Sequence, residues 1–511
     1  MIRFYVGAGA LLLHLATLSR YGYFRDELYF IACARHLAWG YVDQPPLVAL
    51  VAWLAGPFGY HLTALRLPSA IAAALASVVA MQIARELGGA RFAQILAGVG
   101  VALLPAYLLL GNILTTTSFE SLSWILVIWL CVRLTTCHPE PVEGRRAIWI
   151  SLSATVAFGL YGKYSIGLLV VCLLVGLLLT KERKVLRTWW SPIAAVVTTV
   201  LVLPNLWWQL ANGAPFLQVI AGDAVHRHAF NNGLALETHN LATNAVAFVL
   251  EQLVYTNPLS APLWIAALVA PFTWERLRAL RFLTIAYIAL VAASIVLEAK
   301  GYYVIGIYGG FIAIGSVVIE RATAWLRVTA FAALATVAVV TLPLSIPVLP
   351  IHGFIAYTQL LGMTGRNGTT PIVVQPIYAE EFGWERLAHD VAGQYYALPP
   401  AMRTSTAIYA DTYADAGAIA HFGYKDALPP VIGSQNSYWM WGTHGYDGSS
   451  LIAIGASRID VLKQYYRSCV LVATSTEPLK AIVEGPAPIY HCTGPTMPLE
   501  EIWPHLRWYG A

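Results

Sequence analysis

Apolar runs long enough to cross a lipid bilayer recur through the first two thirds of this 511-residue chain. A helix needs about 20 mostly apolar residues to cross the ~30 Å hydrocarbon core. With 58% apolar and only 11% charged residues, the composition is far from that of a soluble protein. We therefore expect an all-α membrane region of about eleven transmembrane helices, at residues 2–20, 61–84, 92–110, 117–134, 147–161, 164–180, 189–205, 258–273, 280–298, 303–320 and 327–347.

Short basic connectors between these runs predict the orientation of the chain. Lys and Arg favour cytoplasmic loops, and five connectors share one side if the N-terminus is inside: 85–91, 138–146, 181–187, 274–281 and 320–327. The first loop (21–60), the long loop 206–257 and the C-terminal segment then lie outside the cytoplasm. The first loop is expected to form two short interfacial helices, at 25–38 and 46–55. The amphipathic stretch 234–255 is expected to lie along the membrane plane.

The composition changes near residue 351, where apolar runs shorten to the length of strands. Alternating strand and helix patterns predict a small soluble α/β domain at 351–511 with a mainly parallel sheet, after a membrane catalytic domain at 1–350. The expected strands are 406–410, 430–433, 451–456, 469–473 and 487–492. A disulfide between Cys469 and Cys492, the two cysteines of this segment, is left open. Cys33, Cys131, Cys137 and Cys172 are expected to be small buried hydrophobic residues.

Ionisable residues beside or within apolar runs are costly, so each needs a partner or a role. Those expected on the outer side are Asp26, Glu27 and Asp43 in the first loop, followed by Arg66, Glu120, Lys163 and Lys300. A carboxylate that accepts a proton and cations that stabilise a departing phosphate suit a transfer reaction. Each residue also has a structural alternative: acids favour helix starts, and Lys or Arg anchors helix ends at the interface.

Several motifs in this chain resemble glycosyltransferase family 39 of the GT-C superfamily, which includes protein O-mannosyltransferases and aminoarabinose transferases of lipid A. In chain order they are RDELYF (25–30), YVDQPPL (41–47), ALRLPSA (64–70), GLYGKYS (159–165), LPNLWWQ (203–209) and KGYY (300–303). The resemblance implies a GT-C-like fold and an inverting transfer from a polyprenyl-phosphate-linked sugar. It also implies a multi-pass protein of the bacterial cytoplasmic (inner) membrane, with its active site and C-terminal domain outside the cytoplasm.

The resemblance also assigns roles to individual residues. Asp26, beside Glu27, matches the family's catalytic base. Lys163 matches a basic residue near the lipid phosphate, and donor-phosphate contacts are expected at Arg66, Lys300 and Tyr303. Two departures argue against the lipid A activity. Asp43–Gln44 stands where the lipid A enzymes have Glu-Lys, and TTTSFESL (115–122) leaves Glu120 as the acid nearest the start of the fourth span.

The sequence therefore predicts a glycosyltransferase that moves a hexosyl or pentosyl group to a lipid, glycan or protein acceptor. No cofactor is assigned, and a divalent metal near the carboxylates is left open. Nothing in the composition indicates a nucleic-acid partner. The alternatives are a polytopic lipid or glycan transporter, which predicts repeat symmetry and charges at the bilayer midplane, and a non-catalytic membrane scaffold.

Overall fold

The computed structural model describes residues 1–136, 142–226, 241–363, 365–367, 370–372, 376–455, 458–479 and 485–510. The chain divides into two compact units. Unit 1 comprises residues 1–18, 66–207 and 227–348, and unit 2 comprises residues 19–65, 208–226 and 349–511. The predicted domains, 1–350 and 351–511, stay a prediction.

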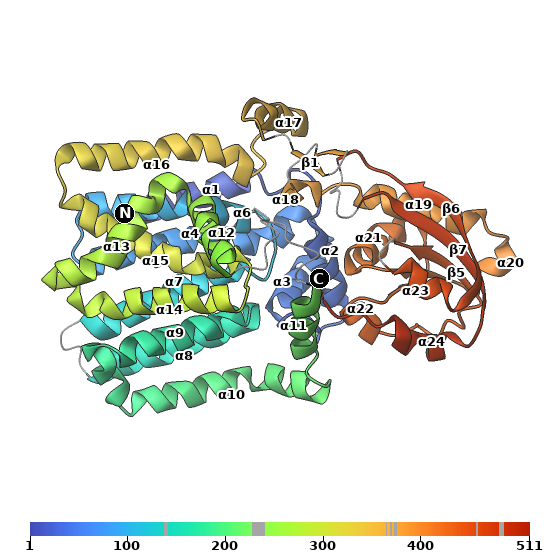
Figure 1. Cartoon of the computed structure of the whole chain (residues 1–511), viewed down its shortest axis with the longest axis horizontal. Coiled ribbons are helices and arrows are strands. Elements are labelled where there is room, and N and C mark those ends of the chain that lie inside the picture. The colour runs from blue at the N-terminus through green and yellow to red at the C-terminus, as the bar shows by residue number, and fades with distance from the viewer. Residues whose placement is uncertain are drawn as a thin grey trace. The chain divides into compact units, whose positions relative to one another are not determined.

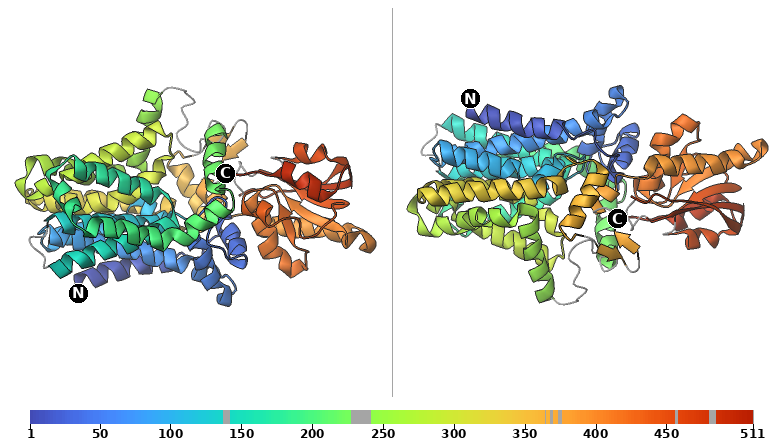
Figure 2. Two further views of the ribbon diagram at one scale, coloured as in Figure 1. Left: turned by 90° about the horizontal axis from the view of Figure 1, so that it is seen from below. Right: turned by 90° about the horizontal axis from the view of Figure 1, so that it is seen from above.

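Unit 1 is a bundle of helices, several of which run side by side (Figures 1 and 2). Two further helices, α4 (Leu62–Glu86) and α10 (Trp190–Ala211), begin or end in unit 2. The remaining α-helices are α1 (Ile2–Leu15), α5 (Arg91–Ala102), α6 (Pro105–Leu110), α7 (Ser118–Thr136), α8 (Val142–Gly162), α9 (Ser165–Leu178), α12 (Leu241–Thr256), α13 (Ala261–Thr273), α14 (Arg281–Val296), α15 (Tyr308–Glu320) and α16 (Ala324–Ser345). Short 3₁₀ helices follow or precede them at η2 (Lys181–Arg187), η3 (Pro258–Ser260), η4 (Glu275–Leu280) and η5 (Gly301–Ile307).

Small residues allow these helices to pack closely. A Cβ atom at Gly176 of α9 would lie 2.1 Å from the Phe282 carbonyl oxygen of α14, and one at Gly315 of α15 would lie 2.0 Å from that of Leu263 in α13. Membrane helices commonly use small residues in this way, because van der Waals packing has to replace the hydrophobic effect inside a bilayer.

By length and composition, six helices in the described part of the chain could cross a membrane, or up to eight if each of two bent pairs is one span. The chain is thus a multi-pass, mainly helical membrane protein, as predicted. The runs expected at 2–20 and 92–110 contain shorter apolar helices, and the total of eleven stays a prediction. Of the stretch 234–255, the part from Leu241 is helical as α12. Residues 234–240 lie outside the described residues, and the orientation along the membrane plane stays a prediction.

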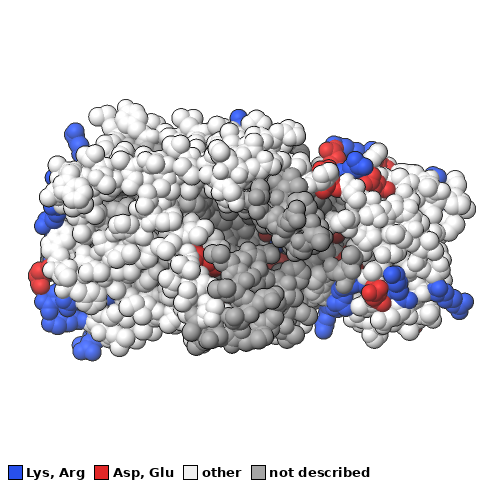
Figure 3. Space-filling view, turned by 45° about the horizontal axis from the view of Figure 1, so that its top comes forward, with Lys and Arg blue, Asp and Glu red and all other residues white. Residues whose placement is uncertain are grey.

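Three of the basic connectors meet at one end of unit 1, where Figure 3 shows Lys and Arg side chains gathered. Arg276 packs against Gly88, where a Cβ atom would lie 1.8 Å from the guanidinium. Glu320 accepts a hydrogen bond from the Ala90 N–H (2.7 Å), and the Arg321 guanidinium lies 4.0 Å from the centre of the Trp274 ring. This common location agrees with the charge pattern; which side of the membrane it faces stays a prediction.

Unit 2 contains the first loop, which forms two short helices, as predicted. They are α2 (Arg25–Arg35) and α3 (Leu47–Ala55), the latter followed by η1 (Gly56–Phe58). Its other helices are α11 (Pro215–His226), α17 (Ile351–Leu360), α18 (Pro376–Ala379), α19 (Trp384–Ala397), α20 (Pro400–Arg403), α21 (Tyr413–Phe422), η6 (Gly423–Asp426), α22 (Ser437–Met440), α23 (Ile459–Lys463) and α24 (Leu499–Leu506).

The C-terminal segment (residues 349–511) contains a five-stranded sheet in the order β4-β3-β5-β7-β6. Its strands are β3 (Thr406–Ala410), β4 (Val431–Gly433), β5 (Ser450–Ile454), β6 (Tyr466–Ser475) and β7 (Ala487–Pro495), and a separate hairpin pairs β1 (Gly365–Asn367) with β2 (Thr370–Ile372). Each of these five strands overlaps one of the five predicted strands. The expectation of a mainly parallel sheet is wrong, because β7 is antiparallel to both β5 and β6.

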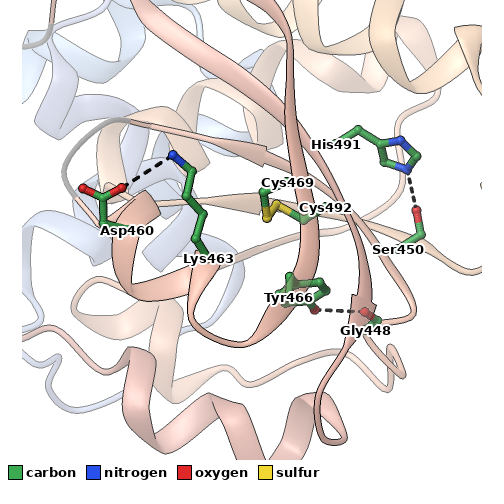
Figure 4. Close-up of a disulfide and its surroundings, with 8 residues drawn as sticks. All are labelled: Gly448, Ser450, Asp460, Lys463, Tyr466, Cys469, His491 and Cys492. Carbon is green, nitrogen blue, oxygen red and sulfur yellow. Dashed lines mark hydrogen bonds and ion pairs between the residues drawn. A yellow bond between two sulfur atoms is a disulfide. The ribbon is translucent and has the colours of Figure 1, made fainter.

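Cys469 and Cys492 form a disulfide between β6 and β7 (Figure 4). The two residues face each other in the antiparallel register, which brings their Cα atoms to 4.0 Å. The free cysteines Cys33, Cys131 and Cys172 are buried, as predicted; Cys137 lies outside the described residues.

Loss of this disulfide is expected to weaken the C-terminal segment. The bridge closes a loop across a sequence separation of 23 residues, and a loop of that length corresponds to about 3 kcal/mol of unfolding free energy. We expect the Cys469→Ala/Cys492→Ala variant to melt at a lower temperature and to lose the effect of reducing agent on melting. An equal response of wild type and variant to reductant would contradict the prediction.

Candidate active site

The adjacent acids Asp26 and Glu27 lie in the first turn of α2 but have different surroundings. Glu27 is fully buried, and its Oε2 accepts a hydrogen bond from the Phe24 N–H at 2.8 Å. A carboxylate at this position satisfies a backbone donor that the helix leaves unpaired. Glu27 therefore fixes the start of α2. The Asp26 side chain keeps 26% of its surface exposed.

Asp26 has two partners in unit 2, and both contact the same oxygen. The Tyr413 hydroxyl donates to Asp26 Oδ1 at 2.9 Å, and Arg25 Nε lies 3.5 Å from Oδ1. Arg25 is shared, since its Nε is also 3.3 Å from Glu380 Oε2. Asp26 is thus a partly exposed carboxylate held by a neutral donor and a shared cation.

Asp43, the acid before the Pro45–Pro46 pair, is held on both oxygens. The Tyr29 hydroxyl donates to Oδ1 at 2.9 Å, and Asn436 Nδ2 donates to Oδ2 at 3.1 Å. Burial raises the pKa of Asp43 to about 7, and the nearby Asp26 adds to the increase. This carboxyl group therefore changes charge near neutral pH.

The raised pKa of Asp43 predicts how the stability of the protein depends on pH. The folded state holds this proton up to about pH 7, whereas the unfolded chain releases it near pH 4. The contribution of Asp43 to stability is therefore present at low pH and declines as pH rises from about 4 to about 7. Melting curves of wild type and Asp43→Asn should diverge over this interval, and a constant difference in melting temperature would contradict the prediction.

A second cluster, in unit 1, surrounds Lys163 at the break between α8 and α9. Its Nζ donates to Thr117 Oγ1 at 2.9 Å and lies 3.4 Å from Glu120 Oε2. The centre of the Tyr303 ring is 4.2 Å from Nζ, and that of Tyr302 is 5.0 Å away. The ammonium is therefore held by a carboxylate, a hydroxyl and two aromatic faces.

Glu120 is the buried member of this ion pair. Its side chain is 2% exposed, against 16% for Lys163, and its other oxygen accepts a hydrogen bond from the Ser165 hydroxyl. An ammonium group has three N–H donors. Thr117 accepts from one of them and Glu120 lies at ion-pair distance, so Lys163 can bind a further acceptor without losing either partner.

The remaining predicted residues of unit 1 have other surroundings. Arg66 is fully buried in α4 and donates to the Leu18 carbonyl, just beyond α1, at 3.2 Å. This contact favours a structural role for Arg66. Lys300 is exposed and precedes η5, the turn that contains Tyr302 and Tyr303.

The structure thus brings Asp26, Glu27 and Asp43 together in unit 2, and Glu120, Lys163 and Tyr303 together in unit 1. Among the described residues, no group of three or more His, Cys, Asp and Glu side chains is placed to hold a metal ion. Sequence reasoning missed the donors Tyr413 and Asn436. They lie 387 and 393 residues from the acids that they contact, and only covariation among homologues could have indicated these pairs.

One family model and several solved structures are similar to this chain. Residues 43–208 match the family model described as dolichyl-phosphate-mannose-protein mannosyltransferase. ArnT from Cupriavidus metallidurans, in the structure bound to undecaprenyl phosphate, aligns with a TM-score of 0.61 at 15% identity, covering 96% of this chain and 97% of ArnT. The chain has a GT-C fold. The predicted resemblance to glycosyltransferase family 39 is thereby confirmed.

Two further solved structures are similar to the chain. Apo ArnT matches the GT-C fold of the chain with a TM-score of 0.60 at 15% identity, with the same coverage. The oligosaccharyltransferase AglB from Archaeoglobus fulgidus aligns with a TM-score of 0.45 at 12% identity, covering 91% of this chain and 70% of AglB. No curated protein sequence matches the chain.

Proposed function

We propose that this chain is an integral membrane inverting glycosyltransferase that moves a sugar from a polyprenyl-phosphate donor to an extracytoplasmic acceptor. The ArnT structure with the same fold is bound to undecaprenyl phosphate, and the matching family model names dolichyl-phosphate mannose. The observation that carries the proposal is the placement of Asp26: a partly exposed carboxylate just after the first apolar helix, with one oxygen held by Tyr413.

In the proposed reaction, Asp26 accepts the proton of the acceptor hydroxyl as that oxygen attacks the anomeric carbon of the sugar. A new C–O bond forms while the bond from the anomeric carbon to the phosphate oxygen breaks. Attack opposite the leaving group inverts the anomeric centre. General-base assistance of this kind contributes about 10²- to 10⁴-fold to a rate.

The leaving polyprenyl phosphate takes the electron pair of the broken bond. Lys163 is the proposed partner for that phosphate, because its ammonium is preorganised by Thr117 and Glu120 and retains one N–H donor. Tyr303 packs against the ammonium, and Lys300 is proposed to attract the phosphate from the exposed start of η5. Arg66 is assigned the indirect role of fixing the end of α1, the helix that leads into the Asp26 loop.

The direct test incubates the purified protein in lipid nanodiscs with radiolabelled polyprenyl-phosphate sugars and a cell-envelope extract as the source of acceptors. The proposal expects free polyprenyl phosphate together with label transferred to the extract. In a parallel assay with sealed vesicles, movement of intact donor across the bilayer without release of phosphate would favour the transporter alternative and overturn the proposal.

A further inference from the structure

Two carboxylates of the first loop, Asp26 and Asp43, receive hydrogen bonds from the C-terminal segment. Tyr413 donates to Asp26 at 2.9 Å, and Asn436 donates to Asp43 at 3.1 Å. All four residues belong to unit 2. The segment therefore reaches the residue proposed as catalytic base.

Tyr413 is held in place by its own surroundings. It is the first residue of α21, and the Thr412 side chain caps this helix by accepting from the Asp415 N–H at 3.1 Å. The Tyr413 N–H donates to Gln435 Oε1 at 2.8 Å, and its ring packs on Tyr29 with 4.9 Å between ring centres. These contacts fix the direction of the hydroxyl, as a positioning residue requires.

Asn436 is oriented by the end of the chain. The Gly510 N–H donates to Asn436 Oδ1 at 3.1 Å, which directs the amide NH₂ group toward Asp43. The Asn436 backbone has a φ of 51° and a ψ of −130°, a conformation that residues with a Cβ atom rarely adopt. Its N–H donates to the Trp508 carbonyl at 2.9 Å.

Helix α21 also lies directly against α2, the helix that carries Asp26. A Cβ atom at Gly417 would lie only 2.9 Å from the Leu28 carbonyl carbon, so glycine is required for the two backbones to approach. The C-terminal segment is thus packed directly against the helix that carries Asp26. The position of Tyr413 relative to Asp26 is therefore fixed by the backbone as well as by the side chain.

We infer that the C-terminal segment contributes to the active site and that its Tyr413 is the residue that positions Asp26. This inference rests on the proposed function. In the described part of the chain, Tyr413 and Arg25 both contact Oδ1 of Asp26, so Oδ2 is the oxygen that receives the proton of the acceptor.

The test compares Tyr413→Phe with Tyr466→Phe. Both variants lose one hydroxyl, but that of Tyr466 donates at 2.9 Å to the Gly448 carbonyl (Figure 4) and not to either acid. Tyr413→Phe should lower kcat about tenfold, the effect of losing one hydrogen bond to a charged group, and leave KM for the lipid donor within about twofold. Tyr466→Phe should change neither kcat nor KM.

Two outcomes would overturn the inference. One is a wild-type kcat in Tyr413→Phe when Asp26→Asn is inactive, which leaves the proposed function intact. The other is additive melting shifts in Asp26→Ala, which removes the acceptor, Tyr413→Phe and the double variant, because residues in contact should be coupled. The melting measurement needs no substrate, so it still decides the contact between Tyr413 and Asp26 if the proposed transfer reaction fails.

Discussion

Asp26→Asn is expected to lower the rate of sugar transfer about 10³-fold, within the range of general-base catalysis. The amide has nearly the shape of the carboxylate and can still accept the Tyr413 hydrogen bond (2.9 Å in the wild type), so the fold should survive. What it loses is the ability to take a proton from the acceptor hydroxyl. Release of free polyprenyl phosphate from labelled donor measures the rate, and membrane insertion with an unchanged melting profile reports on the fold.

Variants of two other acids distinguish a catalytic effect from a structural one. Asp460→Asn removes a carboxylate that is 91% exposed and pairs with Lys463 at 3.5 Å, so its transfer rate should equal that of the wild type. Glu27→Gln weakens the start of α2, where the carboxylate accepts the Phe24 N–H, and should lower the melting temperature more than the turnover of the folded protein. If Asp26→Asn kept the turnover of the wild type, Asp26 could not be the catalytic base.

The first loop could be predicted because its signals are local. The acids Asp26 and Glu27 mark a helix start, and Pro45–Pro46 marks the next one, so α2 and α3 appear close to the expected positions. The sequence could not say which acid caps the helix. That distinction depends on which carboxylate turns back to the backbone, and only the hydrogen bond from the Phe24 N–H settles it for Glu27.

The C-terminal sheet shows the same division between local and distant information. Each strand is visible as a short apolar run, yet a run does not tell which neighbour it will pair with. β7 enters the sheet between β5 and β6 and is antiparallel to both. The link from Tyr413 to Asp26 was equally invisible, because 387 residues separate the two.

The cluster in unit 1 was predicted only in part. Lys163 was identified as an unusual cation between apolar runs, and the structure adds its close partners Thr117 and Ser165, the latter through Glu120. Hydroxyl residues near helix ends are common, so nothing in a single sequence distinguishes these two. The ion pair with Glu120 (3.4 Å) has a further consequence: a neutral side chain in place of Lys163 alone leaves a buried carboxylate without its cation.

Lys163→Gln is expected to lower kcat/KM for the polyprenyl-phosphate donor about 10²-fold, the effect of removing one preorganised charge from a developing anion. Because Glu120 is only 2% exposed, the same variant should also be less stable, since a buried charge loses its partner. Lys184→Gln, an equal change of charge in the exposed connector η2, is the matched control and should keep wild-type values.

The double variant Lys163→Gln/Glu120→Gln distinguishes the two roles of the lysine. In this variant both side chains are neutral, so no buried charge is left without a partner, and the melting temperature should recover toward that of the wild type. The donor phosphate still lacks its ammonium partner, so kcat/KM should stay low. If transfer recovers together with stability, Lys163 serves only to neutralise Glu120, and the leaving phosphate must be bound by a different cation.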